Sequence, residues 1–170
     1  MPERVVSNAG PLIALAKLNL LYLLKQLYGR VYFSRAVYEE TVVEGLRQGL
    51  EDAHTLQLFL TQARWEATQV NVPDELASLH LDQGERESLA LALAEDALFL
   101  IDEERGREEA RRRNITVRGT LGVLVQAYRR GLITSDQLRF YFSQIEKRTD
   151  IWINPSLCRR LLKEVLDVED

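Results

Sequence analysis

The amino-acid sequence predicts an α/β fold built around a parallel sheet. Short apolar segments alternate along the chain with longer segments in which apolar residues recur at helical spacing. The apolar segment 97–101 has charged residues on both sides, as expected of a strand that is buried on both faces. A strand, a turn and a helix then follow one another again over 115–128. This alternation favours parallel strands that are joined by helices.

The expected strands are short and end at turns or at charged residues. Asn8 and Pro11 mark the turn after the first strand, and Pro73 ends the third. The five segments are 4–7, 31–33, 65–72, 97–101 and 115–117.

The expected helices carry stripes of apolar residues, and several of them have recognisable ends. Pro11 stands near the start of the first helix, and Gly29 follows the second. Ser34 is the expected N-cap of the third helix, and Asp82 with Glu85 forms the pattern of a capping box. The nine segments are 12–17, 20–28, 35–46, 50–64, 85–94, 103–113, 121–128, 135–146 and 155–166.

Length and composition indicate one main domain in a reducing compartment. A chain of 170 residues can bury one core, and we expect a domain over 1–133 with a helical extension over 134–170 packed on it. The net charge of -4 means that a nucleic-acid partner would need a local basic face. The single cysteine excludes an internal disulfide, and neither a signal peptide nor a membrane span is recognisable. We therefore expect a cytoplasmic protein without a membrane segment.

Four polar side chains, with a fifth beside them, are expected at one edge of the sheet. The C-termini of parallel strands and the N-termini of the connecting helices share an edge. Asn8 and Asp102 follow strands there, and Glu103 stands beside Asp102. Glu85 opens a helix, and Glu40 lies in the second turn of another. Carboxylates gathered without a cation would repel, so we expect Mg²⁺ or Mn²⁺ to bind them and to support phosphodiester hydrolysis.

Each acid also has an ordinary structural explanation. Glu85 at a helix start is more often a capping residue, by about three to one. Glu40 is more often a solvated helix residue, at similar odds, and Asp102 could be the N-cap of the next helix. The functional interpretation rests on the convergence of several positions at one edge.

Basic side chains lie just beyond the acids. Arg105 and Arg107 could hold phosphates, and Thr120 could contact one through its hydroxyl, although capping of the next helix is the alternative for Thr120. The alternative for the arginines is an exposed helix with acid and base four residues apart. The pairs expected in that case are Glu108 with Arg112 and Glu109 with Arg113.

Five segments stand in a specific order along the chain. They are SNAGPLIALAKL, FSRAVYEETV, LDQGERESLALALAED, LFLIDEERGREEARRRNI and VRGTLGVLVQAYRRGLI. Together they resemble the PIN-like domains, and in particular a bacterial and archaeal branch of that family. The resemblance extends from about Val5 to Ile133.

The resemblance implies a three-layer α/β/α fold with a central parallel sheet of about four to five strands and C-terminal helices. It also implies a metal-dependent endoribonuclease, often the VapC-type toxin of a toxin–antitoxin pair. On this resemblance Asn8 takes the place of the first acid, and Glu40 takes the place of the helical glutamate. Glu85 matches the next acid, Asp102 matches the strand-end aspartate, and Glu103 matches a further acid of this branch.

The expected function is therefore hydrolysis of RNA. The expected catalytic residues are Glu40, Glu85, Asp102 and Glu103, and the expected ligands of Mg²⁺ or Mn²⁺ are Asn8, Glu40, Glu85 and Asp102. RNA, a small antitoxin and a second copy of the chain are the expected partners.

Two alternatives remain open. Because Asn8 brings no negative charge, the chain could be an inactive PIN-like module that binds RNA or a protein partner. A nucleotide-binding domain of flavodoxin type should show a phosphate loop after the first strand, where Gly10 is the only glycine.

Overall fold

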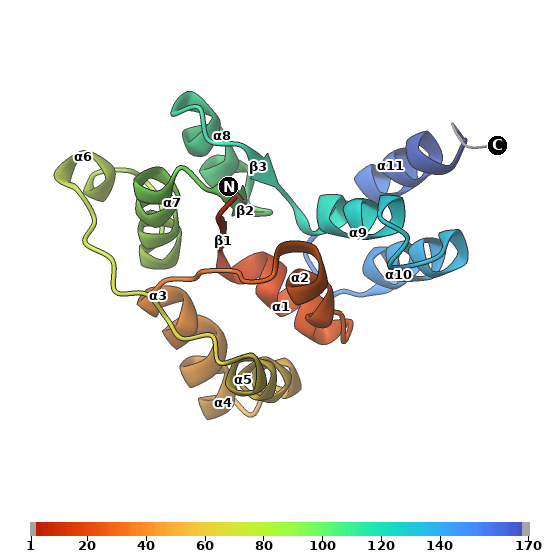
Figure 1. The fold of residues 1–170 in the computed structure, drawn as a ribbon, viewed down its shortest axis with the longest axis horizontal. Coiled ribbons are helices and arrows are strands. Elements are labelled where there is room, and N and C mark those ends of the chain that lie inside the picture. Colours follow the sequence, from red (N-terminus) through yellow and green to blue (C-terminus); the bar gives the residue numbers. More distant parts are fainter. Residues whose placement is uncertain (1–2, 168–170) are drawn as a thin grey trace. The chain divides into compact units, whose positions relative to one another are not determined.

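The computed structural model describes residues 3–167, which form two compact units, one ending at Thr120 and the other beginning at Leu121. The first unit contains a three-stranded parallel sheet. In spatial order the strands are β1 (Val5–Ser7), β2 (Leu98–Leu100) and β3 (Val117–Arg118). Helices connect and cover these strands (Figure 1). The predicted α/β class with a parallel sheet and C-terminal helices is confirmed.

The sheet is smaller than expected because two predicted strands are reduced to single bridges. Tyr32 forms an isolated parallel bridge with Val6, and Thr68 forms one with Ser34. The prediction of a strand over 65–72 is wrong, because its neighbour stops at Ser34, where a helix begins. Thr68 is therefore bonded only to Phe33 and Arg35 on either side of that residue. Three paired strands are present instead of four to five.

The helices of the first unit follow the predicted segments closely. They are α1 (Ala9–Lys17), α2 (Tyr22–Tyr28), α3 (Arg35–Tyr38), α4 (Glu44–Arg47), α5 (Glu51–Ala63), α6 (Asp74–Ala77), α7 (Gln83–Glu95) and α8 (Glu104–Arg112). The short helix α6 was not predicted. The expected helix over 35–46 is interrupted by a π-helical turn, η1 (Glu39–Val43), between α3 and α4. Such turns often mark functional sites, and this one carries Glu40.

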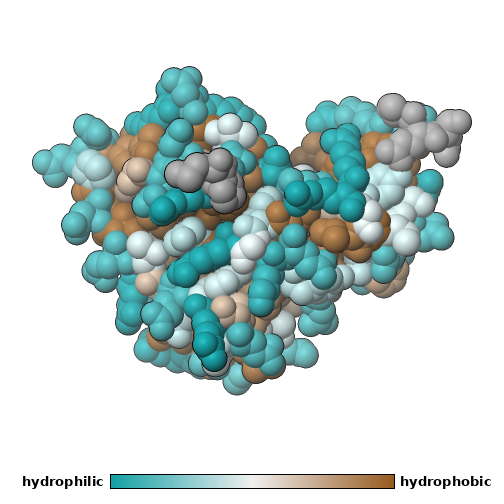
Figure 2. Space-filling view, in the orientation of Figure 1, coloured by the Kyte–Doolittle hydropathy of each residue, from teal (hydrophilic) through white to brown (hydrophobic). Residues whose placement is uncertain are grey.

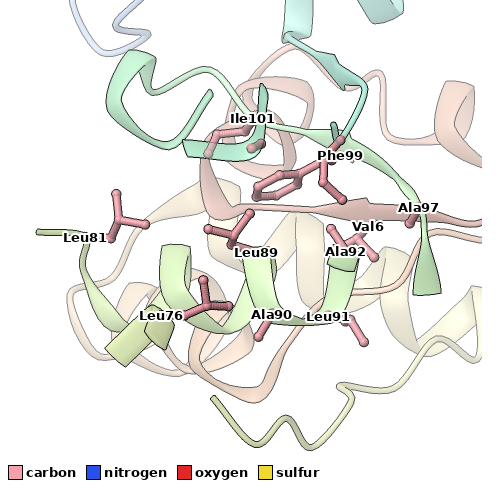
Figure 3. Packing of buried hydrophobic residues seen from close by; sticks show 12 residues of the cluster. Val6, Leu76, Leu81, Leu89, Ala90, Leu91, Ala92, Ala97, Phe99 and Ile101 are labelled. Carbon is pink, nitrogen blue, oxygen red and sulfur yellow. The ribbon is translucent and has the colours of Figure 1, made fainter. Parts of the chain in front are cut away.

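The helix α7 packs on the sheet through small and medium apolar side chains. Figure 3 shows Leu89 and Ala92 of α7 next to Val6 of β1 and Phe99 of β2. All four side chains are almost fully buried, and full burial of a large apolar side chain contributes about 1.5–3 kcal/mol. This packing fixes the direction of α7 and therefore the place of Glu85 in its first turn.

The second unit is helical. Its helices are α9 (Thr120–Arg129), which starts at the last residue of the first unit, α10 (Ser135–Lys147) and α11 (Pro155–Asp167). The three predicted C-terminal helices are therefore confirmed, whereas the domain boundary expected at 133 stays a prediction. Thr134 and Gln137 form a capping box at the start of α10.

No helix within residues 3–167 combines the length and the apolar character needed to cross a membrane. On the face of the molecule shown in Figure 2, hydrophilic residues surround separate hydrophobic patches.

Candidate functional site

Asp102 follows β2 and is held in a fixed orientation by Thr120. The backbone N–H of Thr120 donates to Oδ1 of Asp102 at 2.8 Å, and the Thr120 hydroxyl donates to Oδ2 at 2.6 Å. Burial raises the pKa of Asp102, while the bonds from Thr120 and the charge of Arg107 lower it. A carboxylate has about four acceptor sites, so Asp102 can still bind a cation while both of its oxygens accept these bonds.

Two glycines leave space around this carboxylate. A β-carbon on Gly119 would lie 2.8 Å from Oδ1 of Asp102 and 3.1 Å from Nη1 of Arg107. A β-carbon on Gly10 would lie 3.5 Å from Oδ2. The close approach of the chain at Gly119 allows Thr120 to reach Asp102. This role of Gly119 is not among the predictions from sequence, although its position directly before Thr120 was a usable signal.

Arg107 is fixed close to Asp102, near the same Gly119. Its Nη1 donates to the carbonyl of Ile101 at 2.9 Å, and its side chain is only 22% exposed. Burial lowers the pKa of the Arg107 guanidinium, and the charge of Arg111 lowers it further. The ordinary pKa of an arginine lies far above neutral pH, so the group remains charged there. A rigid cation with unused N–H donors therefore stands next to the strand-end aspartate.

Three carboxylates meet at the first turn of α7. A β-carbon on Gly84 would lie 3.3 Å from Oε2 of Glu40 and 3.5 Å from Oδ1 of Asp82, which places both acids against that glycine. Burial, followed by repulsion from Asp82 and Glu85, raises the pKa of Glu40. The site thus contains Asp82, which the sequence analysis treated only as a helix cap.

Glu85 serves both as a capping residue and as part of this acid group. Its Oε2 accepts from the backbone N–H of Asp82 at 3.1 Å, and its own N–H donates to Oδ1 of Asp82 at 2.8 Å. Burial is the main cause that raises the pKa of Glu85, and the charges of Asp82 and Glu103 also raise it. The structural explanation is therefore confirmed without excluding a functional one, because Oε1 makes no bond in the capping box.

Asn8 connects the end of β1 with β2 and with α7. It is 5% exposed, and its backbone N–H donates to the carbonyl of Leu100 at 2.9 Å, which fixes it at the end of β1. The hydroxyl of Ser88 donates to Oδ1 of Asn8 at 3.4 Å. Ser88 stands three residues after Glu85 on α7, so it lies on the same side of that helix. Asn8 stands at the N-cap position of α1 but makes no capping bond with its side chain.

The remaining predicted residues occupy the start of α8 and its exposed face. Glu103 is the exposed N-cap residue of α8, and its charge acts on Glu85. Arg105 is exposed and donates to the carbonyl of His80 at 3.3 Å. The hydroxyl that Thr120 would need as a phosphate donor is bonded to Asp102.

The arginines at the end of α8 behave as members of an exposed helix. Arg113 pairs with Glu109 at 2.7 Å, as the four-residue spacing predicts. The expected pair of Glu108 with Arg112 is wrong, because Arg112 pairs with Glu109 instead, at 3.0 Å. Glu109 thus binds both Arg112 and Arg113, and neither arginine pairs with an acid of the candidate site.

The donor set fits a hard divalent cation. Within residues 3–167, no three His, Cys, Asp or Glu side chains form a ready-made metal site. Mg²⁺ usually binds one or two protein carboxylates and keeps several waters, so it does not need such a cage. The available donors are all oxygen atoms, and the acids around Gly84 repel one another. The oxygen donors of Asn8, Glu40, Glu85 and Asp102 are therefore of the type that Mg²⁺ or Mn²⁺ prefers.

The raised pKa of Glu40 predicts how the metal-free protein responds to pH. Folding raises this pKa above its ordinary value of 4.5, so the folded chain binds the Glu40 proton more tightly than the unfolded chain does. Ionisation of Glu40 therefore lowers the free energy of unfolding as pH rises through the folded-state pKa. We expect Glu40→Gln to stabilise the metal-free protein at about pH 8, and the gain to vanish below about pH 4.

Urea unfolding of both proteins with chelator at several pH values measures this difference. Glu39→Gln is the matched control, because Glu39 is exposed and pairs with Arg35 at 3.3 Å. This control should show no gain in stability at high pH. A stability difference between Glu40→Gln and the natural protein that does not change with pH would contradict the prediction.

The comparisons with known proteins agree with this fold. A family model described as a PIN domain matches residues 4–167, which is almost the whole chain. A search of curated proteins found no match.

Proposed function

The chain belongs to the PIN domain family, and we propose that it is a ribonuclease that hydrolyses RNA with the help of a divalent cation. PIN domains have a nuclease-type fold and generally depend on a divalent metal. The observation that carries the proposal is the strand-end Asp102, which Thr120 orients beside the partly buried guanidinium of Arg107. The acid group of Glu40 and Glu85 at the start of α7 supports it further.

Each residue of the site has a distinct task in this proposal. Oxygen atoms of Asn8, Glu40, Glu85 and Asp102 would hold Mg²⁺ or Mn²⁺. When bound, the ion would supply positive charge that polarises the phosphate and the attacking water. Glu40 and Glu85 have raised pKa values, which makes either carboxylate suitable to accept the proton of that water.

The basic residues would act on the substrate. Arg107 uses one N–H on the carbonyl of Ile101 and can donate others to the scissile phosphate, where negative charge develops. Arg105 and Glu103 flank this position at the start of α8. Thr120 would act through Asp102, because its hydroxyl and its N–H both hold that carboxylate.

The second candidate function is an inactive module that binds RNA or a protein. Asn8 favours it, because a neutral amide stands where other family members are expected to carry an acid. The intact pair of Asp102 and Thr120 favours the enzyme.

The Asn8→Asp substitution tests whether position 8 lies at a metal site. A carboxylate at this position adds a charged ligand, so we expect the Kd for Mn²⁺ to fall about tenfold, which corresponds to about 1.4 kcal/mol. Asn8 is 5% exposed, so the metal-free variant should be less stable by about 1–3 kcal/mol. Calorimetric titration and thermal unfolding, each with and without Mn²⁺, measure both effects. If the variant binds Mn²⁺ no better than the natural protein, position 8 is not at a metal site.

We also propose a biological setting for this activity. The protein would be the toxin of a toxin–antitoxin pair in the cytoplasm, with a small antitoxin and a second copy of the chain as partners. A domain over 1–133 with the extension 134–170 would form each subunit. A small protein that is encoded beside this chain, copurifies with it and inhibits cleavage would support the toxin assignment.

A cleavage assay tests the proposed activity itself. Purified protein is incubated with a panel of single-stranded and structured RNAs and Mn²⁺ or Mg²⁺, beside samples that contain chelator. We expect cleavage that needs the metal. If no RNA is cleaved under any of these conditions, the binding module replaces the enzyme.

A further inference from the structure

A second candidate site lies on the first unit, outside the acid edge, the name used below for Asn8, Glu40, Glu85 and Asp102. It is a half-open cavity of about 650 Å³ between α3, the end of α5 and the extended segment that follows α5. This volume lies within the range of small-ligand sites, which is about 300–1,000 Å³. The cavity is lined by two cations and one acid, so its charged groups are positive on balance. The lining residues that matter for its chemistry are Arg35, Tyr38, Gln57, Arg64, Trp65 and the exposed Glu66. None of them belongs to the acid edge.

Arg64 has an unusual backbone conformation for its residue type. It ends α5 in the left-handed region, with φ of 60°, and its N–H donates to the carbonyls of Leu60 and Thr61. The other non-glycine residues with positive φ in the described chain are asparagine or aspartate, namely Asn19, Asp96 and Asn114. A left-handed conformation costs a long side chain roughly 1–2 kcal/mol, and glycine would avoid that cost. An arginine at this position therefore has no conformational explanation.

The charge of Arg64 is available to a ligand. Its side chain is exposed at the cavity and, among residues 3–167, has no acidic partner within ion-pair distance. A second cation, Arg35, lines the same cavity, and its acidic partner within residues 3–167 is the exposed Glu39. Exposed ion pairs contribute little, so a phosphate could compete for Arg35 at small cost. The two guanidinium groups together suit a phosphate, which they can bind through paired N–H donors.

Aromatic and amide groups complete the lining. Trp65 is 6% exposed and packs edge-on against Phe59, with ring centroids 5.2 Å apart. The guanidinium carbon of Arg35 lies over the ring of Tyr38, 5.9 Å from the ring centroid. Gln57 is exposed and can both donate to and accept from a base edge. Cations, aromatic rings and an amide around one cavity are the groups that bind a nucleotide in single-stranded nucleic acid.

We propose that this cavity binds one nucleotide of the RNA substrate, with its phosphate on Arg35 and Arg64 and its base against Trp65. The proposal rests on the proposed ribonuclease function and adds a substrate-binding site to it. Tyr38 and Glu40 belong to the same helical segment, in which α3 continues directly into η1, so one segment contributes residues to both sites. The bound nucleotide would flank the scissile phosphate and would contribute to the choice of cleavage site.

Tryptophan fluorescence gives a local probe of the cavity. The chain has two tryptophans, so Trp152→Phe leaves Trp65 as the single emitter. Trp152 is 91% exposed and does not line the cavity, so its replacement should not disturb it. This protein is titrated in chelator with the four nucleoside 5′-monophosphates, with inorganic phosphate and with a ten-nucleotide single-stranded RNA. We expect the nucleotides and the RNA to quench Trp65, and inorganic phosphate to compete without quenching.

Substitution of Arg64 supplies the decisive comparison. Arg64→Asn removes the charge but keeps a residue that tolerates the left-handed conformation. We expect the Kd for the RNA to rise about tenfold with no loss of thermal stability. Arg47→Gln is the matched control, because Arg47 is an exposed arginine of α4 that does not line the cavity. The Kd of this control should change less than twofold.

The outcomes separate the cavity from the catalytic proposal. RNA that fails to quench Trp65, or an Arg64→Asn variant that binds as tightly as its parent, would overturn the nucleotide site. Equal weakening by Arg64→Asn and Arg47→Gln would also overturn it, because the effect would then be nonspecific attraction. Binding is measured in chelator, so it does not depend on the metal. If RNA quenches Trp65 in an Arg64-dependent way but the metal-loaded protein cleaves no RNA, the nucleotide site is supported and the ribonuclease function is contradicted.

Discussion

The Asp102→Asn substitution is expected to lower metal-dependent RNA cleavage about 10²–10³-fold, which is the loss typical of a removed electrostatic group in an active site. The amide oxygen of the substituted side chain would still accept the N–H bond of Thr120, and the Thr120 hydroxyl could turn to accept from the new amide N–H₂ group. The fold should therefore persist while the negative charge at the end of β2 is lost. Single-turnover cleavage of one RNA at saturating Mn²⁺ measures the effect.

A matched control is available at the opposite end of α7. Asp96 is exposed and ends that helix in the left-handed region, with φ of 49°, where asparagine is equally suitable. Asp96→Asn removes the same charge and should leave cleavage unchanged within about twofold. If Asp102→Asn retains full activity, or if Asp96→Asn loses as much, the strand-end aspartate is not part of the catalytic site.

The Glu85→Gln substitution is expected to lower cleavage about 10²-fold without destabilising the metal-free protein. Glutamine can replace glutamate in a capping box, and Gln137 of α10 already does so in this chain. Repulsion within the acid group falls at the same time, because Asp82 and Glu103 both raise the pKa of Glu85. Cleavage rates and urea unfolding in chelator measure the two effects separately.

Glu85→Ala is the useful comparison for this prediction. Alanine removes the charge and also the bond to the N–H of Asp82, so it should lose activity and about 0.5–2 kcal/mol of stability. If both variants lose activity but only the alanine variant loses stability, the negative charge of Glu85 is needed for cleavage. Full activity of Glu85→Gln would show that Glu85 is a capping residue and nothing more.

The order of helices and strands could be predicted because each element has a local signal. The capping box of Asp82 and Glu85 and the buried strand over 97–101 are encoded by neighbouring residues, and both are found in the structure. The strand expected over 65–72 failed for a nonlocal reason, since the helix that starts after Ser34 leaves Thr68 only one bridge partner. In the π-helical turn at Glu39–Val43 the spacing of apolar residues does not differ recognisably from that of an α-helix, so a regular helix was expected there.

The location of the candidate site at one edge of the sheet could be predicted from the sequence, but the arrangement of its side chains could not. Parallel topology brings strand ends and helix starts together, which explains why Asn8, Glu85 and Asp102 could be grouped in advance. The part played by Asp82 depends on the approach of Glu40 to Gly84, and no spacing in the sequence reports that approach. The pair of Thr120 and Asp102 was also missed, because it forms across 18 residues of chain.

The most direct test of this account is calorimetric titration of Mn²⁺ into the metal-free protein, repeated with Asp102→Asn and Asp96→Asn. The account predicts saturable binding to the natural protein that Asp102→Asn weakens at least about tenfold and Asp96→Asn leaves unchanged. Absence of binding, or equal binding to all three proteins, would contradict the claim that these acids form a metal-dependent catalytic edge.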